Sequence, residues 1–236
     1  VFVQRKFGFF EIPLTWWSFL IAFVLFDFLF YWAHRWSHEI NLWWGAHVVH
    51  HSSEEYNLSV ALRQSWFHNA MAFFIFLPLP LIGFKPETIL LAGGLHTLGQ
   101  FWIHTRTIGK LNPCIELVFN TPSHHRVHHG RNPKYIDKNH GGVLIIFDRL
   151  FGTFQVEEED LVYGITSSLN SWNPIWANFH YYAEMGKAMK KMRFWDKIRM
   201  IFAKPGWLPD YLGGFQAPPE VNPEKRIRYD RNTSPL

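Results

Sequence analysis

The sequence predicts an all-α membrane protein: multi-span transmembrane helices that carry a cytoplasmic, histidine-rich helical cap holding a di-metal site. Three observations predict this class, namely long apolar runs, histidines at helical spacing, and a single cysteine. The chain has 236 residues, of which 48% are hydrophobic and 14 are histidine. This length suits one domain, which we place at residues 1–210, with residues 211–236 as an extended tail.

The first apolar run is LTWWSFLIAFVLFDFLFYWA, residues 14–33, in which Asp27 is the only charged residue. About 20 apolar residues are needed for a helix to cross the hydrocarbon core of a membrane. A buried helix of a large soluble protein could share this composition, but two more apolar runs follow. We therefore predict a first transmembrane span over 14–33.

The second and third apolar runs cover residues 66–84 and 87–104 and are separated only by Lys85 and Pro86. Because the linker is so short, the pair predicts a transmembrane hairpin. Two prolines close to the end of the second run predict a kink there, since proline cannot continue the helical hydrogen bonding.

One span followed by a hairpin places the polar segments 34–65 and 105–170 on the same side of the membrane. Their basic residues are Arg35, Arg63, Arg106, Lys110, Arg126, Arg131, Lys134, Lys138 and Arg149. Lysine and arginine are enriched in cytoplasmic loops, so we expect this side to be cytoplasmic. Arg5 and Lys6, on the opposite side, favour the reverse orientation weakly.

Residues 183–204 interleave basic and apolar side chains, which predicts a basic amphipathic helix in the cytoplasmic membrane interface. The basic residues are Lys187, Lys190, Lys191, Arg193, Lys197, Arg199 and Lys204. A surface helix packed on the domain would show the same pattern, so both interpretations stay open. The net charge of +4 suits anionic lipid head groups, and the membrane-length runs argue against nucleic acid as a partner.

The chain begins at Val1 without a methionine, which is typical of a fragment or a processed form. No small-residue cleavage site follows the first apolar run, so we expect no secretory signal peptide. Cys114 is the only cysteine, which excludes an intramolecular disulfide and thiolate metal sites. Any metal must therefore be bound by nitrogen and oxygen.

The histidines gather in two short stretches at helical spacing. The stretches hold His34, His38, His47, His50 and His51, and then His124, His125, His128 and His129. Residues three and four apart share a helix face, whereas adjacent residues point about 100° apart. One helix can therefore direct its adjacent histidines at two metals side by side.

Eight of these histidines, all except His124, are too many for one metal, because a catalytic zinc uses three protein ligands and a water. The segment HRWSH carries Arg35 where a zinc metalloprotease motif needs glutamate. Imidazole suits iron, zinc, copper and nickel, so we predict a paired site of redox metals. His124 is a further candidate, one turn from His128, whereas His68 and His180 are expected to be ordinary polar residues.

The order HRWSH, HVVHH and HHRVHH resembles the fatty acid hydroxylase and sterol desaturase superfamily, whose members are membrane di-iron oxygenases. The flanking segments HHSSEEYNLSVALRQS at 50–65 and NTPSHHRVHHGRNPKYIDKNHGGVLIIFDRLFGTF at 120–154 resemble the branch that oxidises alkylglycerol ether lipids. QFWIHT at 100–105 and KPGW at 204–207 add to the likeness, which extends from about residue 13 to 210.

The resemblance implies two iron ions, which zinc could replace at the same ligands, and an O2-dependent monooxygenase. Its substrate would be a membrane lipid hydroxylated on the carbon next to the ether oxygen, which then splits into a fatty aldehyde and a glycerol lipid. The electron donor would be reduced pterin (tetrahydrobiopterin) or a redox protein. The expected location is the endoplasmic reticulum membrane or the bacterial inner membrane.

Two positions depart from the pattern of the superfamily. Related hydroxylases carry a further His-x-x-x-His pair, of which His104 matches the second member, whereas Gln100 stands at the first. A ninth or tenth ligand therefore stays open, and Gln100 is expected to contact a water or a ligand histidine. His140 stands where the family leads us to expect tyrosine, and we interpret it as a surface residue.

Histidine ligands usually donate their second N–H to a carboxylate or carbonyl. Asp27 lies two helical turns before His34 on the same face, and a carboxylate within a span is expected to be functional. The further candidates for such contacts are Glu39 and Asp137, followed by Glu54, Glu55 and Asp148. The aromatic residues Trp16, Trp17, Phe30, Trp32, Trp43 and Trp44 are expected to line a lipid route or to form an interfacial belt.

Two alternatives remain open from the sequence. One is a sterol, fatty acyl or carotenoid hydroxylase or desaturase of the same superfamily, which lipid product analysis would distinguish. The other is a non-catalytic metal-binding membrane protein, which O2 consumption by the iron-loaded protein would distinguish.

Overall fold

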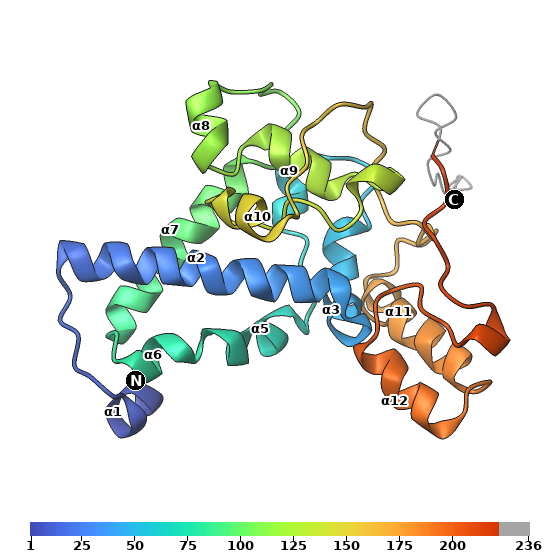
Figure 1. Ribbon diagram of the computed structural model, residues 1–236, viewed down its shortest axis with the longest axis horizontal. Helices are drawn as coiled ribbons and strands as arrows, with labels where there is room; N and C mark the ends of the chain where they lie inside the picture. The colour runs from blue at the N-terminus through green and yellow to red at the C-terminus, as the bar shows by residue number, and fades with distance from the viewer. Residues whose placement is uncertain (222–236) are drawn as a thin grey trace, which may run out of the picture.

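The computed structural model describes residues 1–221, and its longest helix, α2 (Trp16–Glu39), runs from the left edge of the molecule in Figure 1 past its middle. Thr15 and Ser18 form a reciprocal cap at its start. Its 24 residues make a helix about 36 Å long, enough to cross a bilayer core. The predicted first helix is confirmed, and it continues six residues past 33, so that it also carries His34 and His38.

The apolar run 66–84, for which the sequence predicts a span kinked near its end, forms two short helices, α5 (His68–Phe76) and α6 (Pro78–Ile82). The break falls at Pro78, near the predicted kink. Gly83 ends α6 in the left-handed region, at φ 119°. The third run forms α7 (Pro86–Trp102), with Pro86 in its first turn. Among the described residues, only α2 is both long and apolar enough to span a membrane by itself.

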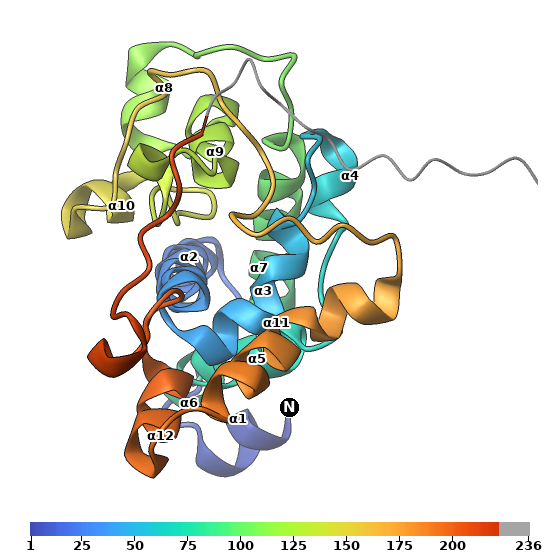
Figure 2. The same ribbon diagram turned by 90° about the vertical axis from the view of Figure 1, so that its right-hand side faces the viewer.

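Beyond the end of α2, the two histidine-rich segments that the sequence places in a cap fold into short helices, and we call these helices the cap. They are α3 (Asn41–His51), α4 (Leu58–Ala61), α8 (Pro113–Val118), α9 (Pro122–His129), the 3₁₀ turn η1 (Pro133–Tyr135) and α10 (Ile146–Phe151). Residues 1–221 contain isolated β-bridges but no strand. Both views show α8, α9 and α10 on one side of α2 and α5 and α6 on the other (Figures 1 and 2).

Helix α2 packs on α7 and α3, and the contacts hold the apolar part of the molecule to the cap. Phe26 of α2 stacks on Phe76 of α5, with ring centroids 4.4 Å apart. Ala22, Leu79 and Phe84 form the buried centre of this apolar part. This apolar packing holds α2 and α7 beside each other, so the histidines at their ends are brought close together.

The C-terminal part differs from the single helix predicted at 183–204. It forms α11 (Pro174–Met189) and α12 (Phe194–Phe202), joined by a turn. One short helix-like turn, η2 (Asp210–Leu212), follows, and Leu212 packs on the buried methionines of α11 and α12. The first residues of the predicted tail are therefore attached to the domain, and residues 222–236 lie outside the described part. Helix α1 (Phe2–Phe7) contacts α6 at the opposite end of the molecule.

Candidate metal centre

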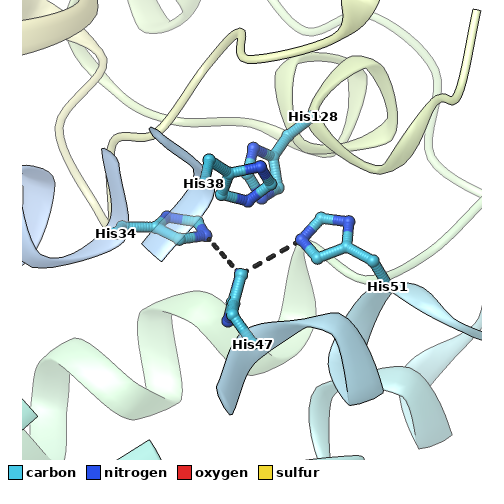
Figure 3. A group of neighbouring side chains, drawn as sticks. All are labelled: His34, His38, His47, His51 and His128. Atoms are coloured by element: carbon cyan, nitrogen blue, oxygen red, sulfur yellow. Dashed lines mark hydrogen bonds between the residues drawn. The ribbon is translucent and has the colours of Figure 1, made fainter. Parts of the chain in front are cut away.

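Nine buried histidines converge into two adjacent groups between α2, α3, α9 and the end of α7. The first group is His34, His38, His47, His51 and His128, and the second is His50, His104, His125 and His129. Within each group, one ring nitrogen per residue lies within 4.8 Å of all the others. Figure 3 shows the first group, whose rings converge from three separate helices.

Adjacent histidines on one helix are divided between the two groups. On α3, His47 and His51 are four residues apart and enter the first group, whereas His50 enters the second. On α9, His128 enters the first group, and its neighbours His125 and His129 enter the second. Each of these helices therefore serves both groups, and His104 joins the second.

The distances between ring nitrogens match those between ligands of one metal ion. The Nε2 atom of His47 lies 3.1 Å from Nε2 of both His34 and His51 (Figure 3). In the second group, Nε2 of His104 lies 2.9 Å from Nε2 of His125 and 3.3 Å from that of His50. Two nitrogens each bound at about 2.1 Å and 90–110° apart would be separated by about 3.0–3.4 Å.

The other ring nitrogen of several of these histidines donates to a backbone carbonyl. Nδ1 of His34 donates to the carbonyl of His140 at 2.8 Å, and Nδ1 of His128 donates to that of Lys138 at 2.9 Å. Nδ1 of His104 donates to the Gln100 carbonyl at 2.8 Å. Such contacts fix the ring orientation and leave Nε2 available for a metal.

The protonation state of the groups also fits metal binding. Burial, and then the neighbouring imidazoles, hold the pKa of His125, His128 and His129 well below the usual range. These rings are therefore neutral, which is the form that binds a metal. Nε2 of His38, His128 and His129 is buried without a hydrogen-bond partner, an unfavourable arrangement that a bound metal would relieve.

Asp27 of α2 forms hydrogen bonds to two other segments, helix α7 and the loop at 143–144. Its carboxylate is fully buried and accepts hydrogen bonds from Nε2 of His96 at 2.6 Å and from the backbone of Val143 and Leu144 at 2.8 and 2.9 Å. The Gln100 side chain donates to Nδ1 of His96 at 2.6 Å. Asp27 therefore contacts His96 and the backbone at 143–144. Its position in the sequence had led us to expect a contact with His34, and the structure shows none.

We expect Asp27→Ala to weaken metal binding and turnover by about 10–100-fold, the usual effect of losing a partner that orients metal ligands. The reason is that Asp27 holds both α7, next to His104, and the loop whose His140 carbonyl orients His34. Asp27→Asn keeps the shape and one acceptor oxygen, so its loss should be smaller. Metal content and turnover measured on membrane-inserted protein test this, and an unchanged alanine variant would reduce Asp27 to a structural group.

The loop that follows His140 requires glycine where it meets Asp27. A Cβ at Gly142 would lie 2.2 Å from Nε2 of His96 and 2.7 Å from Oδ1 of Asp27. Asp148 holds the same loop, accepting from the backbone of His140 and Gly141 at 2.7 and 2.6 Å. Burial raises the pKa of Asp148 to about 6.

We predict that Gly142→Ala lowers the free energy of unfolding by about 1–3 kcal/mol, the typical cost of overpacking. Gly186→Ala is the matched control, because a Cβ there meets no atom within 4 Å and alanine favours the helix by up to about 1 kcal/mol. Thermal unfolding in detergent measures both variants. Equal stability of Gly142→Ala and the unmodified chain would contradict the close contact.

Other predicted positions lie outside the two groups. His124 is buried on α9, 3.8 Å from Glu116, and Glu39 pairs with Arg35 and Lys204 at 3.3 and 3.4 Å, away from the histidines.

Asp137 lies 3.8 Å from Nδ1 of His38, too far for a hydrogen bond. His68 and His180 also stay outside both groups.

Two residues were misjudged or missed from the sequence. The interpretation of His140 as a surface residue is wrong: it is fully buried, its ring lies 5.1 Å from that of His38, and neither ring nitrogen has a hydrogen-bond partner. His96 was overlooked, although it is 1% exposed. Its signal was the spacing of His96, Gln100 and His104 by four residues within an apolar run.

A cavity of about 320 Å³ opens beside both groups. Its polar wall includes His34 and His47 of the first group and His50, His104 and His125 of the second. Its apolar wall comes from α2, α5 and α7 and includes Phe26, Phe30, Ala72, Ile75, Phe76 and Phe101. Of the six aromatic residues expected near a lipid route, Phe30 and Trp43 line it.

The helical fold brings nine histidines from distant segments into two adjacent groups, each of which could hold a metal ion. The chain belongs to the fatty acid hydroxylase family, whose model matches residues 19–153. The resemblance to this superfamily is therefore confirmed, as are membership of an oxidoreductase family and its association with lipids and membranes.

The chain is 44% identical to alkylglycerol monooxygenase of Homo sapiens over 95% of its length and 41% identical to that of Danio rerio over 96%. It covers 50% and 51% of those proteins, so it spans about half the length of these relatives. It is also 30% identical, over 57% of its length and 41% of the relative's, to an ornithine lipid hydroxylase of Rhizobium tropici. No solved structure matches it.

Proposed function

We propose that this chain forms the catalytic part of a membrane di-iron monooxygenase that cleaves alkylglycerol ether lipids by hydroxylation. The observation that carries the proposal is the cavity that reaches from the two histidine groups into an apolar space between α2, α5 and α7. The similarity to alkylglycerol monooxygenases over most of the chain supports the choice of lipid.

The first group would hold one iron ion through five imidazoles, and the second group would hold another through four. Two bound iron ions would supply activation of O2 and removal of a hydrogen from an unactivated C–H bond. The chain offers no thiolate at either group, so the ligands are neutral imidazoles, which zinc would also accept without supplying redox chemistry.

The cavity walls would position the substrate. Phe26, Ile75 and Phe76 offer an apolar surface for the alkyl chain, and Gln64 and Gln100 offer amides for a polar head. Holding the reacting carbon in place beside the histidine groups, while apolar walls exclude water, accounts for selectivity among the many C–H bonds of a lipid.

The reaction balances as a monooxygenation. One oxygen atom of O2 enters the C–H bond next to the ether oxygen, and the other leaves as water with two electrons and two protons from a reduced donor. The resulting hemiacetal separates into a fatty aldehyde and a glycerol lipid. A reduced pterin is the donor that we propose.

Within the membrane, we propose that α2 and the hairpin of α5, α6 and α7 contact lipid, with the cap on the cytoplasmic side. Exposed apolar side chains on these helices support this, among them Leu20 and Val24 on α2, Phe74 on α5 and Leu90 on α7. The membrane would be the endoplasmic reticulum or a bacterial inner membrane. In α12, the exposed Phe194, Trp195, Ile198 and Phe202 support a place in the lipid interface.

The test is to incubate purified, iron-supplied protein with a 1-O-alkylglycerol, O2 and tetrahydrobiopterin and to assay fatty aldehyde. Aldehyde that depends on all three supports the proposal. Oxidation of a sterol or an acyl lipid without aldehyde would assign the chain to another branch of the family. No O2 consumption with any lipid would favour a non-catalytic metal-binding protein.

A further inference from the structure

A second cavity, of about 600 Å³, lies beside the first and outside the two histidine groups. Its walls come from the segment after α3, the segment 63–66 and the start of α11. The backbone N–H of Trp66 donates to the Asn178 side chain at 3.0 Å, which holds two of these walls together. Gln64 lines both cavities and separates them.

The lining of this second cavity differs from that of the first. It has two indole rings, Trp66 and Trp172, which are 63% and 66% exposed. Carboxylates from Glu54 and Glu55 and the guanidinium of Arg63 contribute charge, and the amide side chains are Asn57, Gln64, Asn170, Asn173 and Asn178. Indole faces stack on flat heterocycles. Carboxylates accept hydrogen bonds from ring N–H groups, and amides can both accept from ring N–H groups and donate to carbonyl groups.

Two residues that line the second cavity, Arg63 and Gln64, contact a proposed iron ligand. Nδ1 of His50 donates to the carbonyl of Arg63 at 3.2 Å, and the Gln64 amide lies 3.4 Å from the same nitrogen. The Arg63 side chain in turn donates to Ser52 at 3.2 Å. A molecule in this cavity is therefore separated from the second histidine group by a single layer of residues.

We infer that the second cavity binds the electron donor, as a flat, nitrogen-rich bicyclic reductant of the pterin class stacked against Trp172. This inference rests on the proposed function, because the monooxygenation needs two electrons and two protons from a donor. The donor would be oxidised by two electrons in this cavity while the lipid occupies the first one. Gln64, which lines both cavities, and the Arg63–His50 contact connect them.

The experiment measures binding of tetrahydrobiopterin to the metal-free protein by anaerobic equilibrium dialysis. Trp172→Ala and Glu55→Gln both change exposed residues that line the cavity. Trp195→Ala is the matched control, because Trp195 is 75% exposed and lies on α12, outside both cavities. We expect Trp172→Ala to raise the Kd at least about 10-fold, the size of a lost stacking contact.

In the iron-loaded protein, the same variants should raise the KM for the pterin and leave the KM for the lipid unchanged. Equal pterin affinity in the cavity variants and the control, or no pterin binding by the unmodified chain, would overturn the inference. So would reduced flavin binding in place of the pterin. Binding that is lost in Trp172→Ala, in a protein that oxidises no alkylglycerol, would support the pterin site and refute the proposed function.

Discussion

Replacing His128 with alanine is expected to remove at least one metal ion per chain and to lower lipid oxidation by more than about 100-fold. Losing a residue that only orients a ligand costs about 10–100-fold, and loss of a ligand itself should cost more. His128 lies in the first group, but it is on the same helix turn as His129 of the second. Disturbing one group is therefore expected to disturb the other.

The control for this variant is His124→Gln on the same helix. His124 is as buried as His128 but belongs to neither group. Its ring accepts from the Thr121 backbone at 3.4 Å as part of a helix cap, and glutamine can take that place in a capping box. We expect this variant to keep two metals and its turnover, and loss of metal from it alone would contradict the assignment of the groups.

Blocking the apolar cavity is expected to have the second largest effect. Ala72 of α5 lines the cavity, so Ala72→Trp would place an indole where the alkyl chain is proposed to lie. Misplacement of the reacting carbon by about 1 Å can cost on the order of 100-fold in rate. Turnover of alkylglycerols of increasing chain length measures this, and we expect the loss to grow with length.

Ala70→Trp is the matched control, because Ala70 is on the same helix and exposed, and it does not line the cavity. The same bulk added there should leave turnover within about twofold of the unmodified chain, as expected for a surface change. Equal losses in both variants would show that α5 tolerates no added bulk, and no loss in either would remove the lipid from this cavity.

The sequence was most informative where local spacing determines geometry. The ring directions of His47, His50 and His51 follow from their positions on one helix, and the same holds for α9. The assignment of individual histidines to the first or second group required the packing of α2, α3, α7 and α9, which no local pattern specifies. His104 could be recognised only because the resemblance pointed to it.

Contacts between distant segments could not be predicted from the sequence. Asp27 was singled out from the sequence as a partner of His34, but the histidine that it contacts is His96, which lies 69 residues away. His140 was predicted to lie on the surface because its neighbours in the sequence are polar. In the structure, its backbone N–H donates to Asp148 and its carbonyl accepts from His34, and these contacts hold its loop inside the protein. Such burial depends on tertiary hydrogen bonds rather than on local polarity.

Helix ends were also hard to predict in the apolar and basic runs. The run 66–84 has the composition of a span, but proline at position 78 divides it into α5 and α6. The basic run 183–204 is divided between α11 and α12, and the turn between them lets Met185, Met192 and Met200 meet in one buried cluster. The composition of these segments indicated that they are apolar or amphipathic helices, but it did not show where each helix is interrupted.

The metal content of the purified protein tests the central claim most directly. After expression with added iron, elemental analysis should find two iron ions per chain, and X-ray absorption at the iron edge should show a nitrogen-only shell at about 2.1 Å. Zinc in place of iron, at two ions per chain, would still agree with two histidine sites. One metal ion or none per chain in fully iron-supplied protein would contradict the account.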